Sequence, residues 1–168
     1  MRKIFVSSII LVVLMAVSVS AFTGHEMWRL QLDSPVTSGI TISEGTVFFG
    51  TETGRIYAVN AKSGSIVWDF KGDNTVYGKP SIVRDMVVFA KGDGEIIALK
   101  ASDGSFVWAA GGIGGRDTRG HAVNDGLSDG TSAGGGLVYV SKADRKVHAF
   151  RDNDGRTAWT VYAGASAR

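Results

Sequence analysis

Ser63-Gly64-Ser65-Ile66-Val67-Trp68 is the stretch that decides the fold, because its glycine stands four residues before a tryptophan. The same spacing recurs wherever the chain has a tryptophan, in the pairs Gly24–Trp28, Gly64–Trp68, Gly104–Trp108 and Gly155–Trp159. Successive tryptophans are 40, 40 and 51 residues apart. A turn and an aromatic residue that return at a period of about 40 residues indicate a repeat architecture.

The apolar runs between these motifs repeat in the same register. Gly45–Thr51 aligns with Asp85–Lys91 and Gly136–Lys142, and Arg55–Ala61 aligns with Glu95–Ala101 and Lys146–Asp152. One small residue recurs in the same position of the second run, as Ala58, Ala98 and Ala149. Because β-branched and aromatic residues fill the runs and turn-forming residues separate them, each repeat is expected to form about four strands of an antiparallel meander. Nine of these strands are expected near residues 47–50, 55–60, 65–70, 87–90, 95–100, 105–110, 137–141, 146–151 and 157–162.

Several of the expected strands are apolar at consecutive positions, as in Val47-Phe48-Phe49 and Met86-Val87-Val88-Phe89. An unbroken apolar run is typical of a strand that is covered on both faces. The blades of a β-propeller meet this condition, since each four-stranded sheet is packed between its neighbours. A sandwich or barrel is the competing all-β fold, but it would not repeat its tryptophan at a fixed offset. We therefore predict an all-β chain that forms a partial β-propeller of about three four-stranded antiparallel blades.

The segments Ala61-Lys62-Ser63-Gly64 before Trp68 and Ala101-Ser102-Asp103-Gly104 before Trp108 resemble the tryptophan-docking motif of pyrroloquinoline-quinone-like (PQQ-like) repeat propellers. The third copy departs from the motif, with Asp152 where alanine is expected. The resemblance extends over residues 24 to 162. It implies that each indole ring packs between blades rather than against a ligand. The residues expected to form these structural contacts are Gly24, Trp28, Gly64, Trp68, Gly104, Trp108, Gly155 and Trp159.

The N-terminus has the pattern of a secretory signal. Arg2-Lys3 precedes an apolar core, and small residues stand at the end of Val19-Ser20-Ala21. This pattern predicts a signal peptide over residues 1–21 that is cleaved after Ala21, and hence an exported, periplasmic, secreted or envelope-associated protein. An uncleaved membrane anchor is the alternative, since the apolar stretch is almost long enough to span a bilayer. The chain has no cysteine, which excludes a lipoprotein anchor, disulfides and thiolate metal sites.

The charge of the chain argues against nucleic-acid binding. The sequence has 18 basic and 16 acidic residues, and removal of Arg2 and Lys3 with the signal leaves 16 of each. A nucleic-acid-binding protein would keep a basic patch in its mature form.

The number of repeats is small for a closed ring, which usually has about 4–8 blades. Residues 22–168 are expected to form one repeat domain, with repeats at about 33–72, 73–112 and 113–162 and a partial repeat at 24–32. Such an arc should leave one apolar sheet face open at each end. Either the chain is a fragment of a longer propeller, or a protein partner or self-association completes the propeller. Two arcs placed head to tail, or a larger propeller protein, would supply the missing surface. The isolated chain is then expected to bind a hydrophobic dye or to self-associate.

The longer interval between Trp108 and Trp159 places an insertion at residues 111–130, and insertions in repeat proteins are often binding loops. Its polar side chains are a tentative binding set, Arg116, Arg119, His121, Asp125 and Asp129, in which the basic residues suit an anion. Its glycines are not followed by a helix pattern, so a phosphate cradle is disfavoured. The spacing of its acidic residues does not match a calcium-binding EF-hand loop. A solvated surface loop is the alternative, and the seven glycines of the segment favour low order.

No catalytic, cofactor-binding or metal-binding residues are predicted from sequence motifs. The resemblance implies PQQ and calcium only through the quinoprotein dehydrogenases of the family, whose length and vicinal cysteines this chain lacks. Two functions follow from the resemblance. The first is an exported, non-catalytic module that acts as a protein-interaction or assembly scaffold in the cell envelope, with membrane contact only through an uncleaved signal segment. The second is a fragment of a PQQ-dependent oxidoreductase.

Overall fold

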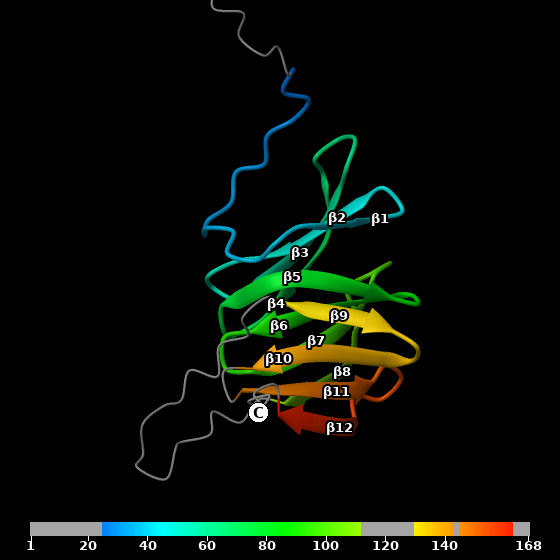
Figure 1. The fold of residues 1–168 in the computed structure, drawn as a ribbon. Helices are drawn as coiled ribbons and strands as arrows, with labels where there is room; N and C mark the ends of the chain where they lie inside the picture. The colour runs from blue at the N-terminus through cyan, green and yellow to red at the C-terminus, as the bar shows by residue number, and fades with distance from the viewer. Residues whose placement is uncertain (1–24, 112–129, 143–144, 163–168) are drawn as a thin grey trace, which may run out of the picture.

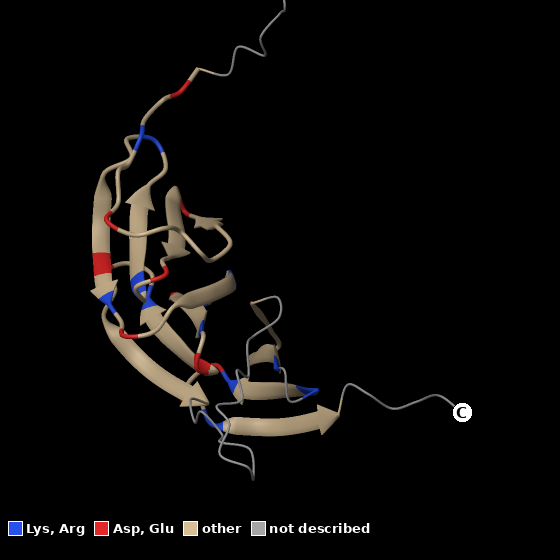
Figure 2. Ribbon diagram, turned by 90° about the vertical axis from the view of Figure 1, so that its left-hand side faces the viewer, with Lys and Arg blue, Asp and Glu red and all other residues tan. Residues whose placement is uncertain are grey.

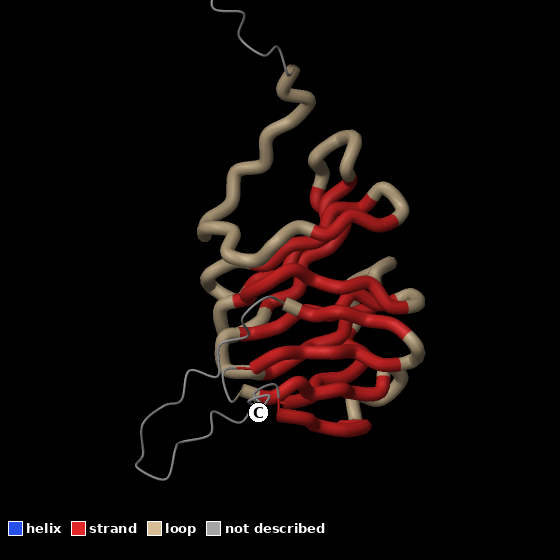
Figure 3. The backbone as a smooth tube through the Cα atoms, in the orientation of Figure 1, coloured by secondary structure: helices blue, strands red, loops and turns tan. Residues whose placement is uncertain are grey.

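The computed structural model describes residues 25–111, 130–142 and 145–162. Within these ranges every regular element is a strand, and no helix is formed (Figure 3). The signal segment 1–21, Gly24 and most of the predicted binding loop lie outside the described residues.

Twelve strands form three four-stranded antiparallel sheets (Figure 1). The first sheet contains β1 (Thr41–Ser43), β2 (Thr46–Gly50), β3 (Arg55–Asn60) and β4 (Ile66–Lys71). The second contains β5 (Val76–Val83), β6 (Met86–Lys91), β7 (Glu95–Lys100) and β8 (Phe106–Gly111). The third contains β9 (Thr131–Gly134), β10 (Leu137–Lys142), β11 (Lys146–Arg151) and β12 (Thr157–Tyr162). In each sheet the strands are neighbours in sequence order, which is the predicted meander.

The sheets stack in a curved row that does not close into a ring (Figure 2). This arrangement confirms the prediction of a partial propeller with three four-stranded blades. All nine expected strands are present within one or two residues. The structure adds β1, β5 and β9, the first strand of each sheet, which sequence patterns did not place.

The central strands of the first two sheets are buried on both faces, as their unbroken apolar runs predicted. All six residues of β6 are buried, and so are Val47, Phe48 and Phe49 in β2. Phe48 packs toward the second sheet, in a cluster with Trp68, Val87 and Phe89. Val47 and Phe49 face the other way and meet residues of the N-terminal segment. The core therefore lies between sheets, so that each sheet is stabilised mainly by contact with its neighbours.

The small residue that repeats in the sequence has a structural reason. Ala58, Ala98 and Ala149 pair across the sheet with Trp68, Trp108 and Trp159, and the strand register shifts directly after each alanine. All three alanines are fully buried. In the first sheet the Phe48 and Trp68 rings lie 5.9 Å apart on either side of Ala58. A larger side chain at this position would separate the two rings, so the repeat keeps alanine there.

Candidate functional site

The docking contact between sheets is made three times with the same geometry. The indole Nε1 of Trp28 donates a hydrogen bond to the Ala61 carbonyl oxygen at 2.9 Å. Trp68 makes the same bond to Ala101, and Trp108 makes it to Asp152, again at 2.9 Å. In each case the tryptophan belongs to the repeat that precedes the acceptor's repeat in the sequence. The contact therefore joins consecutive units of the row and satisfies an indole N–H that would otherwise be buried without a partner.

A glycine lies under each docked ring. A Cβ atom at Gly64 would lie 2.6 Å from the ring of Trp28, and Cβ atoms at Gly104 and Gly155 would lie equally close to Trp68 and Trp108. The backbone at these glycines is also left-handed, with φ between +70° and +73°. Both the close approach of the ring and the positive φ select glycine. We call the acceptor carbonyl and this glycine the acceptor turn.

Asp152 departs from the family motif without disturbing the contact. Its carbonyl oxygen accepts the Trp108 indole as the alanines do in the other repeats. Its buried carboxylate forms an ion pair with Arg84 of the second sheet, with Nε and Oδ2 3.1 Å apart. The substitution therefore adds a charged link between the second and third sheets.

Trp159 is the one docking tryptophan of the described chain that has no acceptor turn. Its side chain is 43% exposed, compared with 8% for Trp68 and 5% for Trp108. Its ring lies 5.8 Å from that of Tyr139 in its own sheet. Val161, two residues further along β12, is 52% exposed. We call the surface formed by Tyr139, Val147, Trp159 and Val161 the open face of the third sheet.

The opposite end of the row is covered, which corrects the expectation of an open face at each end. Trp28, Leu30 and Leu32 pack on Val47, Phe49, Tyr57 and Val59 of the first sheet. Residues 25–32 do this without forming a strand, although the expected tail of a fourth repeat suggested one. The docking face that remains uncovered among the described residues is thus that of the third sheet, where Trp159 and Val161 are exposed.

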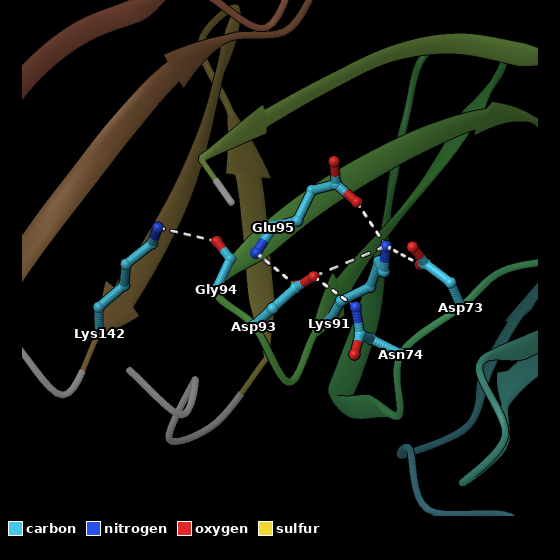
Figure 4. A network of polar contacts seen from close by, with 7 residues as sticks. All are labelled: Asp73, Asn74, Lys91, Asp93, Gly94, Glu95 and Lys142. Atoms are coloured by element: carbon cyan, nitrogen blue, oxygen red, sulfur yellow. Dashed lines mark hydrogen bonds and ion pairs between the residues drawn. The ribbon is translucent and has the colours of Figure 1, made fainter. Parts of the chain in front are cut away.

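A polar network ties the first two sheets together on one side of the row (Figure 4). The Lys91 side chain is only 7% exposed, and its Nζ lies 2.6 Å from Asp73, 2.5 Å from Glu95 and 3.9 Å from Asp93. Asn74 donates a hydrogen bond to Asp93 at 2.7 Å. The ammonium thus links the loop that follows β4 to the turn between β6 and β7.

The lysine at the same position of the third repeat links the third sheet to the second. Lys142 matches Lys91 in the aligned repeats, and its Nζ donates a hydrogen bond to the Gly94 carbonyl oxygen at 2.8 Å. The network borders a groove of about 370 Å³ between the first two sheets, whose apolar wall includes Phe70, Ile97 and Phe106. The arrangement suits a structural link between blades, because every charged group of Figure 4 is engaged by a protein partner.

The charges of this network stabilise one another. The hydrogen bond and positive charge of Lys91 lower the pKa of Asp73 below its ordinary value. Burial alone would lower the pKa of Lys91, but its hydrogen bonds to Asp73 and Glu95 outweigh burial and raise that pKa. Both groups are therefore charged at neutral pH, as an ion pair that links two sheets requires.

The tentative binding residues Arg116, Arg119, His121, Asp125 and Asp129 lie outside the described residues, as does Gly24. In the described ranges, no group of three or more His, Asp or Glu side chains is placed to hold a metal ion. Among the same residues, no helix is long and apolar enough to cross a membrane.

The stacked four-stranded sheets, their tryptophan-docking contacts and their acceptor turns define a β-propeller of PQQ-like repeats. A family model described as outer membrane protein assembly factor BamB matches residues 15–159. The chain belongs to this family, as its docking motifs predicted.

Solved structures show the same fold. BamB from Moraxella catarrhalis is 22% identical with a TM-score of 0.66, and the match covers 81% of this chain and 39% of that protein. A quinohemoprotein alcohol dehydrogenase from Pseudomonas putida is 16% identical with a TM-score of 0.65, over 80% of this chain and 22% of that enzyme. The computationally designed Ika4 protein is 17% identical with a TM-score of 0.66, over 82% of this chain and 79% of the design. This chain thus spans less than half the length of the two natural proteins. No curated protein sequence matches it significantly.

Proposed function

We propose that this chain is an exported, non-catalytic PQQ-like repeat module that acts as a protein-interaction or assembly scaffold in the cell envelope. The observation that carries the proposal is the open face of the third sheet. Trp159 is exposed on this face, whereas the equivalent tryptophans Trp68 and Trp108 are docked on the neighbouring sheet. Aromatic side chains on an exposed apolar face are typical of protein-binding surfaces.

Family membership supports the envelope part of the proposal, because the family model is described by an outer-membrane assembly factor. Export rests on the basic start and apolar core of residues 1–21. N-terminal sequencing of the protein recovered from the envelope fraction is expected to begin at Phe22. An N-terminus at Met1 in that fraction would indicate the uncleaved anchor instead.

Site-specific photo-crosslinking tests the surface. A photoreactive amino acid at Val161 lies on the open face, and one at the similarly exposed Ile42 in β1 lies away from it and serves as the matched control. In cells, Val161 is expected to yield discrete protein adducts and Ile42 to yield few. Equal adducts at both positions, or none at Val161, would contradict the scaffold role of this face.

A fragment of a quinoprotein dehydrogenase is the second candidate, and the fold likeness to a quinohemoprotein alcohol dehydrogenase is what favours it. Calcium-dependent dye reduction by the purified protein loaded with PQQ distinguishes the two functions. Turnover above that of free PQQ would support the enzyme, whereas crosslinked partners without turnover would support the scaffold.

A further inference from the structure

The four tryptophans are anchored unequally. Trp68, Trp108 and Trp159 stand on β4, β8 and β12, each of which is paired along its length with the neighbouring strand. Trp28 stands on residues 25–32, which form no strand. No backbone hydrogen bond joins this segment to the rest of the described chain. Its attachment consists of three apolar side chains and the single Trp28 to Ala61 hydrogen bond.

The surface beneath residues 25–32 has the features of an interface between sheets. Val47, Phe49, Tyr57 and Val59 project from the first sheet toward the segment. The aligned residues of the second sheet, Val87, Phe89, Ile97 and Leu99, are covered by the whole first sheet instead. Three side chains of an irregular segment thus take the place that a complete four-stranded sheet takes one repeat later.

The open face of the third sheet is the matching half of such an interface. Tyr139, Trp159 and Val161 align with Phe48, Trp68 and Phe70 of the first sheet, which are the residues that pack against the second sheet. At one end, the described chain therefore presents a docking tryptophan, Trp159, with no acceptor turn to receive it. At the other end it has an acceptor turn, Ala61 and Gly64, that is filled by a weakly held tryptophan.

We propose that residues 25–32 are a replaceable cap, and that the site beneath them docks the third sheet of a second copy of this chain. In this contact the Trp159 indole of one copy donates its hydrogen bond to the Ala61 carbonyl of the other and its ring lies over Gly64. The interface continues the stacking already present between the sheets, so it needs no new kind of contact. It rests on the proposed function, since it assigns a partner to the same open face.

The two occupants of the acceptor turn compete. The cap has the advantage of being tethered beside its site, which a second copy must offset by concentration. The third sheet has the advantage of a rigid face that adds Tyr139 and Val161 to the buried tryptophan. Because the two contacting surfaces differ, copies join head to tail, either into a closed ring or into an open chain.

Loosening the cap is the direct test. Trp28→Ala in the full chain is expected to tighten self-association by about tenfold or more, because the acceptor turn is then available for a larger fraction of the time. Sedimentation velocity over a concentration series measures the change. Leu30→Ser with Leu32→Ser loosens the cap by a second route and should act in the same direction. Circular dichroism confirms that each variant keeps its strand content.

The donor is tested by removing it. The double variant Trp28→Ala, Trp159→Ala has an open acceptor turn and no docking indole, and it is expected to be monomeric alone. Mixed with the wild-type chain, which supplies Trp159, it should form a heteromeric complex. Self-association of the double variant as strong as that of Trp28→Ala would overturn the inference, since exposed apolar surface alone would then explain the association.

The outcomes also separate this inference from the proposed function. If Trp28→Ala stays as weakly associated as the wild type while Val161 still crosslinks to another protein, the second copy is not the occupant and the scaffold role stands. If Trp28→Ala associates through Trp159 and Val161 crosslinks only to copies of this chain, the open face serves self-assembly and no other partner.

Discussion

Replacing Trp108 with alanine is expected to weaken the contact between the second and third sheets strongly. The Trp108 side chain is 5% exposed, and its ring lies over Gly155 while its Nε1 bonds to Asp152 at 2.9 Å. A tryptophan buries about 150–250 Å², which at about 25 cal/mol per Å² corresponds to about 4–6 kcal/mol as an upper bound. Measured Trp→Ala substitutions in cores cost about 3–5 kcal/mol, which is the decrease we expect in the free energy of unfolding.

The matched control is Trp159→Ala, which changes the same position of the repeat where no acceptor turn follows. Since Trp159 is 43% exposed and packs against Tyr139 of its own sheet, its loss should cost about 1–2 kcal/mol. Trp108→Phe keeps an aromatic ring and leaves the Asp152 carbonyl without its donor, for an expected cost of about 1–2 kcal/mol. Urea unfolding followed by far-UV circular dichroism measures all three variants. Equal costs for Trp108→Ala and Trp159→Ala would refute the reasoning, because contacts within a sheet would then carry the energy.

Three further predictions follow from other parts of the structure. Gly104→Ala should destabilise the chain by about 2–4 kcal/mol, measured by the same unfolding assay, because its Cβ would lie 2.6 Å from Trp68 at a φ of +73°. Because the folded chain lowers the pKa of Asp73, its pairing with Lys91 stabilises the protein above the unfolded pKa of about 3.9 and is lost as pH falls through the folded value. Asp73→Asn should therefore flatten the decline of stability between about pH 5 and pH 3. Limited trypsin digestion should cut first after Arg116 or Arg119, and initial cuts within the sheets would contradict the low order expected of residues 111–130.

The fold could be predicted from the sequence because the residues of each docking motif occupy one short stretch of the repeat. The glycine, the tryptophan and the small residue lie close together within each repeat and return in register, so alignment of the repeats identifies them. Two of the three first strands, β1 and β9, were missed for a physical reason. β1 and β9 are only three and four residues long, and their residues, Thr41-Ile42-Ser43 and Thr131-Ser132-Ala133-Gly134, lack an apolar run. Their pairing with the next strand decides their structure, and sequence patterns do not show that pairing.

The Lys91 network was also not predicted, because its members come from separate segments. Asp73 lies 18 residues before Lys91, and only the packing of two sheets brings them together. One signal was present, since Lys91 and Lys142 occupy the same position in aligned repeats, at the end of an apolar run. A lysine that recurs at such a place indicates a link to the neighbouring repeat. The sequence could not have shown which carboxylates surround it.

The positions of the docking tryptophans and of the acceptor turns explain why one end of the described row is covered and the other is open. All three acceptor turns that the structure describes are filled, and all by tryptophans of the same chain. Four tryptophans therefore serve three acceptor turns, and the one left over is Trp159 on the well-paired strand β12 rather than Trp28 on an irregular segment. Because the better anchored Trp159 has no acceptor turn among the described residues, the row can extend from the third sheet toward a partner that presents a free one. The first sheet can offer such a turn only by releasing residues 25–32.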